Sequence, residues 1–218
     1  MKSILLSTLV AFGVAVSAPA FAVPTPVTMY DTMTGDTFES GFNYAVTQAS
    51  QGWAEMFNSG LATTLTSVYA YVTQTSNNGA EVALQILSNA GGGVPGSTVI
   101  WASGSLAGAS GGITVSGLSQ AITAGTDYWL AVLPTNRQQA QWMQGDAGNL
   151  GTIASYDVPG THWDAYILPV GENYAAGAIV TGSYNAEPPP SGVPEPASLA
   201  LLGGAVVGLG ALRRRKAA

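Results

Sequence analysis

Four aromatic residues in the second half of the chain have side chains suited to binding sugars: Trp142, Tyr156, Trp163 and Tyr166. They stand among glutamine, asparagine and glycine residues. An exposed aromatic ring can stack on the apolar face of a sugar, while neighbouring polar groups bind its hydroxyls. Aromatic residues of a β-protein are more often packed in its interior, which is the alternative for these four. Glycan contact is therefore a hypothesis that depends on their exposure.

His162 is the only histidine, and it precedes Asp164 by two residues. On an extended segment this spacing places both side chains on one face. A catalytic triad would also need an activated nucleophile, and the chain contains no G-x-S-x-G motif. Histidine-based metal sites need partner ligands that the chain lacks. We therefore expect a structural or exposed loop histidine, and we predict no catalytic residue.

The acidic residues suggest two further hypotheses. Glycoside hydrolysis needs two carboxyl groups that converge in space, and the sequence alone cannot locate such a pair. Calcium prefers hard oxygen ligands, which Asp31–Asp36 and Asp146–Asn149 offer next to glycine turns, although neither segment matches an EF-hand loop. Turns capped by their own side chains are the alternative. The sequence predicts no cofactor and no defined metal site, with a structural calcium ion as a hypothesis.

The charge balance excludes several partners. Of the six Lys and Arg residues, only Arg137 lies between residues 23 and 186, against ten Asp and Glu in the same stretch. Nucleic-acid binding requires cations that displace counterions from phosphates, and attraction to an anionic membrane surface requires them as well. The chain has no cysteine, which excludes disulfides, thiol catalysis and cysteine-ligated zinc.

Period-two alternation of apolar residues predicts strands over 66–73, 81–88 and 127–133. In the first of these, Val68, Ala70 and Val72 share one face, and two tyrosines lie on the other. Weaker patterns predict further strands at 27–30, 54–57, 98–102, 112–115, 140–143, 153–157, 165–168 and 178–184.

Glycine- and proline-rich turns separate these segments, and no long amphipathic helix precedes residue 197. About eight to eleven short strands at such spacing predict an all-β fold, an antiparallel β-sandwich or jelly roll, over residues 23–186. A repeat solenoid is the rival, but the sequence shows no fixed period. We expect this domain to be flanked by an N-terminal signal-peptide helix and a C-terminal hydrophobic helix.

One internal stretch carries a family resemblance. A strand at 82–87 is followed by the turn Pro95-Gly96-Ser97, a second strand at 99–102 and the segment 124–132 with its Tyr128-Trp129 pair. Residues 82–133 resemble the choice-of-anchor β-sandwich domains, which occur with interchangeable C-terminal anchors. The resemblance implies a β-sandwich and no enzymatic activity.

Residues 1–22 have the pattern of a secretory signal peptide: a basic start, an apolar stretch, and Ala20-Phe21-Ala22 as the cleavage site. An uncleaved signal anchor is the alternative. The small residues at Ala20 and Ala22 favour cleavage.

The C-terminus has three successive parts after a proline-rich linker at 187–192. These are Val193-Pro194-Glu195-Pro196, an apolar run at 197–212, and the basic end Arg213-Arg214-Arg215-Lys216. As a helix with a rise of about 1.5 Å per residue, the apolar run would span roughly 24 Å, short of the membrane core of about 30 Å. Its four glycines also have poor helix propensity. This is a weak transmembrane segment, and the basic end orients it with the preceding domain outside.

In that order and at that place, the three parts of residues 193–218 resemble the PEP-CTERM sorting tail of exported proteins of Gram-negative bacteria. The resemblance implies that an exosortase-type enzyme recognises Val193, Pro194, Glu195 and Pro196. It also implies transient insertion in the inner membrane, followed by sorting to the cell surface or extracellular matrix. A plain tail anchor is the alternative.

Together these features predict an exported, non-enzymatic surface or matrix protein with a structural or adhesive role. A carbohydrate-binding module acting on extracellular polysaccharide is the second hypothesis, and an extracellular glycoside hydrolase is the third.

Overall fold

The computed structural model describes residues 22–34, 43–46, 51–74, 78–108, 111–145, 152–157, 162–166 and 175–186. Within these residues the protein is all-β, and its strands pair in antiparallel sheets. Residues Pro24–Asn185 form one compact unit. The prediction of an antiparallel all-β fold is confirmed. The two flanking helices were predicted in segments that lie, apart from Ala22, outside the described residues.

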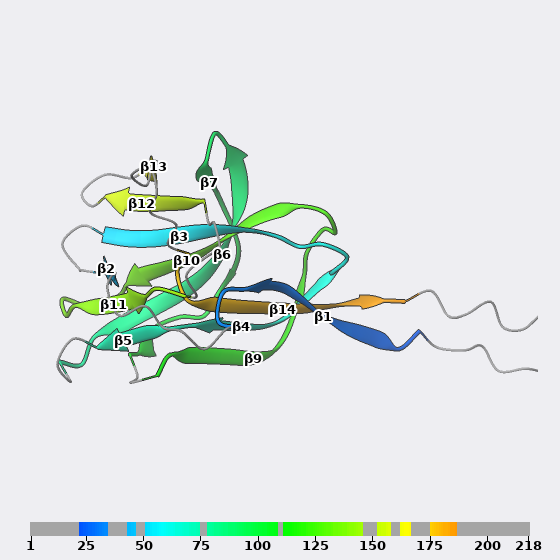
Figure 1. Ribbon diagram of the computed structural model, residues 1–218, viewed down its shortest axis with the longest axis horizontal. Helices are drawn as coiled ribbons and strands as arrows, with labels where there is room; N and C mark the ends of the chain where they lie inside the picture. The colour runs from blue at the N-terminus through cyan, green and yellow to red at the C-terminus, as the bar shows by residue number, and fades with distance from the viewer. Residues whose placement is uncertain are drawn as a thin grey trace, which may run out of the picture. The chain divides into compact units, whose positions relative to one another are not determined.

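The first sheet has four strands and forms one layer of the domain (Figure 1). In spatial order its strands are β1 (Pro24–Asp31), β14 (Ala178–Asn185), β4 (Thr64–Ala70) and β9 (Ile113–Ala121). Pro24 and Pro26 lie on the edge strand β1, where a missing backbone N–H is tolerated.

The second sheet has seven strands and forms the facing layer. In spatial order its main strands are β13 (Trp163–Tyr166), β12 (Ile153–Asp157), β3 (Gln51–Asn58), β10 (Asp127–Pro134), β6 (Glu81–Gly91) and β7 (Val94–Ala102). The short strand β8 (Leu106–Ala107) pairs with the beginning of β6.

A third sheet of three strands completes the described fold: β2 (Asn43–Val46), β11 (Ala140–Met143) and β5 (Val72–Gln74). Strand β5 follows β4 after Tyr71 alone, so one continuous run of chain passes from the first sheet to the third.

The main core lies between the sheets and follows the predicted alternation. Val68, Ala70 and Val72 are fully buried in it, while the intervening tyrosines keep some exposure, as the sequence predicted. Alternate residues of β6 and β10 join the same cluster: Val82, Leu84, Ile86, Tyr128, Leu130 and Val132. Each large apolar side chain buried in this way contributes about 1.5–3 kcal/mol. Hydrophobic burial therefore stabilises this cysteine-free domain.

The opposite face of the seven-stranded sheet carries a second, smaller core. Its buried members are Ala54, Leu87, Trp129, Ala131 and Ala154. The indole Nε1 of Trp129 donates a hydrogen bond to Asn89 Oδ1 over 3.1 Å, so its polar group is satisfied. The central strands β3, β10 and β6 are consequently covered on both faces.

The β6–β7 hairpin turns through three consecutive glycines with positive φ, Gly91, Gly92 and Gly93, a conformation that other residues rarely adopt. A Cβ placed on Gly93 would lie 3.7 Å from the Cβ of Ala165 on β13. The hairpin tip therefore reaches the strand at the opposite edge of the same sheet, and β7 and β13 are in contact. The seven-stranded sheet curls, which makes its outer face concave.

Some strands differ from the sequence predictions. The segment predicted at 165–168 is strand β13, which begins two residues earlier at Trp163. Strands β2 and β8 were not predicted; β8 has only two residues, too few to show an alternating pattern.

The structure corrects one prediction about an aromatic residue. Trp142 on β11 is fully buried in the main core, and its Nε1 donates to the backbone oxygen of Gly177 over 3.0 Å. A ring enclosed in this way cannot stack on a sugar. Trp142 therefore belongs to the core rather than to a glycan-contact surface.

We predict that Trp142→Phe lowers the free energy of unfolding by about 1–3 kcal/mol, because it removes a buried hydrogen bond and leaves a void. Urea denaturation of the purified protein measures this change. Trp163→Phe, at a half-buried position of β13, is the matched control and should have a smaller effect. Equal effects of the two variants would contradict the placement of Trp142.

Candidate functional site

A cavity of about 480 Å³ lies on the concave outer face of the seven-stranded sheet. This volume falls within the range of about 300–1,000 Å³ that is usual for small-molecule sites. We call it the outer pocket. Five strands and the residue before β13 supply its lining: Gln85, Leu87, Val94, Pro95, Gly96, Ser97, Val99, Leu133, Tyr156, His162 and Trp163.

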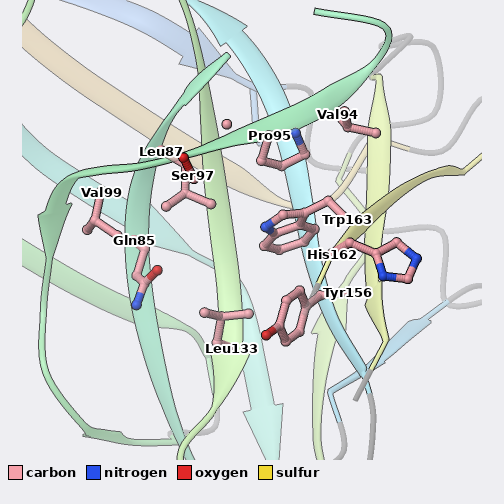
Figure 2. A pocket seen from close by; sticks show the side chains of 11 residues that line it. Gln85, Leu87, Val94, Pro95, Ser97, Val99, Leu133, Tyr156, His162 and Trp163 are labelled. Atoms are coloured by element: carbon pink, nitrogen blue, oxygen red, sulfur yellow. The ribbon is translucent and has the colours of Figure 1, made fainter. Parts of the chain in front are cut away.

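Two aromatic rings form one side of the outer pocket. Tyr156 on β12 and Trp163 on β13 are paired across the two strands, and their ring centroids lie 5.1 Å apart at an interplanar angle of 51°. Figure 2 shows both rings projecting toward the strands on the other side of the pocket. Both residues are only partly buried, so ring surface remains available. Cross-strand packing of this kind holds aromatic side chains in fixed orientations.

Polar groups without partners converge on the same space. Among the described residues, the side-chain amide of Gln85 and the hydroxyl of Ser97 accept or donate no hydrogen bond, and neither does the hydroxyl of Tyr156 nor the indole nitrogen of Trp163. By contrast, the indole of the buried Trp142 is hydrogen-bonded within the fold. Unused donors and acceptors beside an apolar surface are typical of a binding site.

Gly52 on β3 makes the close packing of the pocket floor possible. A Cβ at this position would collide with the side chain of Leu133 and would lie 3.5 Å from the Cβ of Tyr156. The two neighbours therefore approach each other over a strand that has no side chain there. A glycine inside a strand signals such a close approach, but Gly52 precedes the segment 54–57 in which the sequence predicted this strand.

His162 lines the rim of the outer pocket rather than its centre. Its Nε2 lies 3.3 Å from Asp164 Oδ2, and both side chains are mostly exposed, at 68% and 56%. In Figure 2 the imidazole is directed away from the Trp163 ring. Within the described part of the chain, no hydrogen bond links His162 to Ser97, the hydroxyl on the opposite side.

Asp31, one of the predicted calcium ligands, caps the turn that follows β1. Its Oδ1 accepts hydrogen bonds from the backbone N–H groups of Met33 and Thr34 over 2.8 and 3.0 Å, and its Oδ2 accepts one from the Thr34 hydroxyl. Partial burial acts to raise the pKa of Asp31, but these hydrogen bonds outweigh it, and the pKa is lowered. The carboxylate is thus engaged in capping its own turn, as in the alternative interpretation.

The other predicted calcium ligands, Asp36, Asp146 and Asn149, lie outside the described residues. Among the residues that are described, no group of three His, Asp or Glu side chains could hold a metal ion.

The structure describes the side chains of three of the four aromatic residues that were predicted to contact a glycan. The structure brings Tyr156 and Trp163 together at the outer pocket and places Trp142 in the main core. The backbone of Tyr166 pairs with Ile153, but its side chain is outside the description. Gln85, Ser97 and Gly52 were not predicted as site residues, because only the curled sheet brings them near the aromatic pair.

Glu55 on β3 is a carboxyl group buried in the main core, at 1% exposure. Its Oε2 accepts a hydrogen bond from the backbone N–H of Ala176 over 2.7 Å, and its Oε1 accepts one from the hydroxyl of Tyr30. Tyr30 lies on β1, so this carboxyl connects the two facing sheets.

Burial raises the pKa of Glu55 from its ordinary value of 4.5 to about 8, although both hydrogen bonds act to lower it. The pKa of Tyr30 is raised as well, mainly by burial and then by the neighbouring Glu55 carboxyl. The Tyr30 hydroxyl therefore keeps its proton and remains a donor. Because Glu55 lies on the inner face of β3, it does not reach the outer pocket. The carboxyl is a structural group that is neutral over most of the physiological pH range.

Comparison with known protein families identifies the C-terminal segment. Residues 192–216 match the family model of the PEP-CTERM protein-sorting motif. The match includes Val193, Pro194, Glu195 and Pro196 together with the apolar run and the basic residues Arg213, Arg214, Arg215 and Lys216. This confirms the predicted resemblance of the tail. The choice-of-anchor resemblance of residues 82–133 stays a prediction.

No curated protein matches the chain. The sorting motif implies export, processing at the membrane by an exosortase-type enzyme, and localisation at the cell surface. Among the described residues, no helix is long and apolar enough to cross a membrane. The predicted transmembrane segment 197–212 lies outside these residues.

We predict that Glu55→Gln removes a pH dependence of stability. In the folded state the carboxyl stays neutral up to about pH 8, while in the unfolded chain it ionises above about pH 4.5. The unfolded state therefore releases its proton first, and the wild type loses stability as the pH rises from about 4.5 to about 8. Glutamine keeps an acceptor for Ala176 and cannot ionise.

Urea denaturation at pH 5 and pH 8.5 measures this effect. The wild type should be less stable at the higher pH by a few kcal/mol, and Glu55→Gln should differ much less between the two. Glu81→Gln, at an exposed carboxyl of β6, is the matched control and should behave like the wild type. Parallel pH profiles for wild type and Glu55→Gln would contradict the assignment.

We predict that replacing Pro194, Glu195 and Pro196 with alanines leaves the chain uncut in the inner membrane, because the processing enzyme no longer recognises it. The wild type should end near the linker at 187–192 and be found outside the membrane. Intact mass and cell fractionation distinguish the two. An uncut chain in both cases would mean that residues 197–212 are a plain tail anchor.

Proposed function

We propose that this exosortase-sorted chain is a non-enzymatic adhesion protein that holds extracellular polysaccharide in its outer pocket. The observation that carries the proposal is the Tyr156–Trp163 pair, which faces Gln85 and Ser97 across a concave surface; the polar groups of these two side chains bond no other described residue. The structural role and the carbohydrate-binding role were alternatives at the sequence level. The pocket supports joining them in one function.

The chemistry of the outer pocket suits a sugar. A sugar ring presents an apolar face of C–H groups and a rim of hydroxyls that donate and accept hydrogen bonds. The indole of Trp163 and the phenol ring of Tyr156 offer flat apolar surface, and each carries a polar tip. The amide of Gln85 offers both a donor and an acceptor, and so does the hydroxyl of Ser97. A sugar residue can thus satisfy apolar and polar groups at once.

The lining supports a binding role rather than hydrolysis. Glycoside hydrolases position two carboxyl groups about 5–9.5 Å apart around the bond that they cleave. The described residues that line the outer pocket include no Asp or Glu. The buried carboxyl of Glu55 faces the main core, on the other side of the sheet. An extracellular hydrolase is accordingly the weaker hypothesis.

The sorting signal gives the binding domain a place to act. An export route that ends at the surface brings the outer pocket to the polymers that surround the cell. In this proposal the cell is a Gram-negative bacterium, the tail enters the inner membrane only transiently, and polysaccharide is the lasting partner. Because the domain is anionic, it does not bind nucleic acid in this proposal.

We predict that Tyr156→Ala and Trp163→Ala each weaken binding to polysaccharide by about tenfold, since covering about 60 Å² of apolar ring surface contributes about 1.5 kcal/mol. Co-sedimentation of the purified protein with extracellular polymer from its own cells measures this binding. Tyr184→Ala removes a partly buried tyrosine from β14 of the other sheet and is the matched control.

All three variants should keep the wild-type circular dichroism spectrum. If Tyr156→Ala and Trp163→Ala bind polymer as tightly as Tyr184→Ala, the outer pocket is not the binding site. If the wild type itself does not sediment with polymer, the adhesive role is wrong.

A further inference from the structure

We propose that the outer pocket selects an uncharged N-acetylated amino sugar within the polysaccharide and rejects acidic sugars. This inference rests on the proposed function and names the class of sugar that the same pocket takes. Three independent features carry it: the absence of Lys, Arg, Asp and Glu from the described lining, the side-chain amide of Gln85, which bonds no described residue, and the apolar surface beside that amide.

The described residues that line the outer pocket include no Lys, Arg, Asp or Glu. His162 stands at the rim, where its Nε2 is within 3.3 Å of Asp164, and Figure 2 shows its ring directed away from the pocket centre. Carboxylate or sulfate groups of a ligand bind best to Arg or Lys, which form charge-assisted hydrogen bonds. An acidic sugar would lose its hydration here without gaining such a partner.

The charge of the whole domain acts in the same direction. Arg137 is the one Lys or Arg among residues 23–186, and it lies in the turn between β10 and β11 rather than in the pocket lining. Ten Asp and Glu residues share that stretch, so the domain repels a polyanion. At physiological ionic strength this repulsion extends over about 8 Å. It therefore repels every acidic sugar of a long polymer that comes within this distance of the domain.

Gln85 supplies the feature that can recognise an N-acetyl group. Its side-chain amide is half-buried and forms no hydrogen bond with any described residue. An N-acetyl group is also an amide, with one N–H donor and one carbonyl acceptor. The amide of Gln85 can donate to the N-acetyl carbonyl or accept from its N–H, one at a time because the two point in opposite directions in a trans amide. The Ser97 hydroxyl, on the neighbouring strand, can bond a ring hydroxyl.

The methyl of an N-acetyl group also finds suitable surface. Leu87 and Val99 line the outer pocket on the same side as Gln85, and Leu133 lies between Gln85 and Tyr156 (Figure 2). Val99 is 51% exposed, one of few large apolar side chains in the described part of the chain that remain open to solvent. Covering such surface with one methyl group raises affinity by about fourfold. A plain hexose offers neither the amide nor the methyl.

The test compares three tetrasaccharides of the same linkage binding to the full-length chain, by isothermal titration calorimetry. The probes are oligomers of N-acetylglucosamine, of glucose and of a uronic acid. We expect the N-acetylated oligomer to bind at least about tenfold more tightly than the glucose oligomer, because it adds a hydrogen bond between amides and a buried methyl. We expect no measurable binding of the uronic acid oligomer.

A variant locates the preference. Gln85→Leu should bind the N-acetylated oligomer about as weakly as the glucose oligomer, while leaving the latter nearly unchanged. Gln120→Leu, at a glutamine of β9 in the other sheet, is the matched control and should keep the wild-type preference. If Gln85→Leu does not fold, the comparison of the three oligomers on the wild type still decides the matter.

The outcomes separate the two proposals. Equal binding of the N-acetylated and glucose oligomers, or tightest binding of the uronic acid oligomer, would overturn the inference and leave carbohydrate binding standing. Failure of all three to bind, together with no sedimentation on native polymer, would overturn both.

Discussion

The central strands β3, β10 and β6 are covered on both of their faces, and the rest of the structure depends on this constraint. One face packs against the first sheet in the main core, and the other carries the second core around Trp129. Strands buried in this way tolerate almost no charge in their interior, which is why the buried acid Glu55 has a raised pKa and is hydrogen-bonded to Tyr30 and Ala176. The outer pocket lies where the outer packing ends and the β6–β7 hairpin folds back over the sheet.

The fold could be predicted from the sequence to the extent that burial leaves a local pattern. The alternation around Val68 gave the correct faces of β4 and β5, and the predicted segments 140–143 and 153–157 coincide with β11 and β12. The predicted position of β13 was two residues too far along the chain. Its true position is set by pairing with β12, where Trp163 meets Tyr156, rather than by its own composition. The three-stranded sheet depends on distant contacts of short strands, which no local pattern reveals.

The site was harder to predict, since residue type does not report exposure. Trp142 and Trp163 both have polar neighbours in the sequence, yet one is sealed in the main core and the other borders the outer pocket. Gln85 reads as an ordinary strand residue until the curled sheet sets it opposite an aromatic pair. Glu55 did leave a signal, a lone acid in the apolar strand Trp53–Phe57, which points to a buried carboxyl with dedicated partners.

The pairing of β1 with β14 has a mechanical consequence. Pro24 is opposite Asn185, so the chain enters and leaves the domain side by side (Figure 1). A pull on the chain beyond Asn185, against a load held in the outer pocket, would act along β14. That strand is bonded on both sides, to β1 and to β4, so the force would shear two hydrogen-bond ladders together instead of peeling one open pair by pair. A central strand as the point of attachment makes the domain resistant to drag.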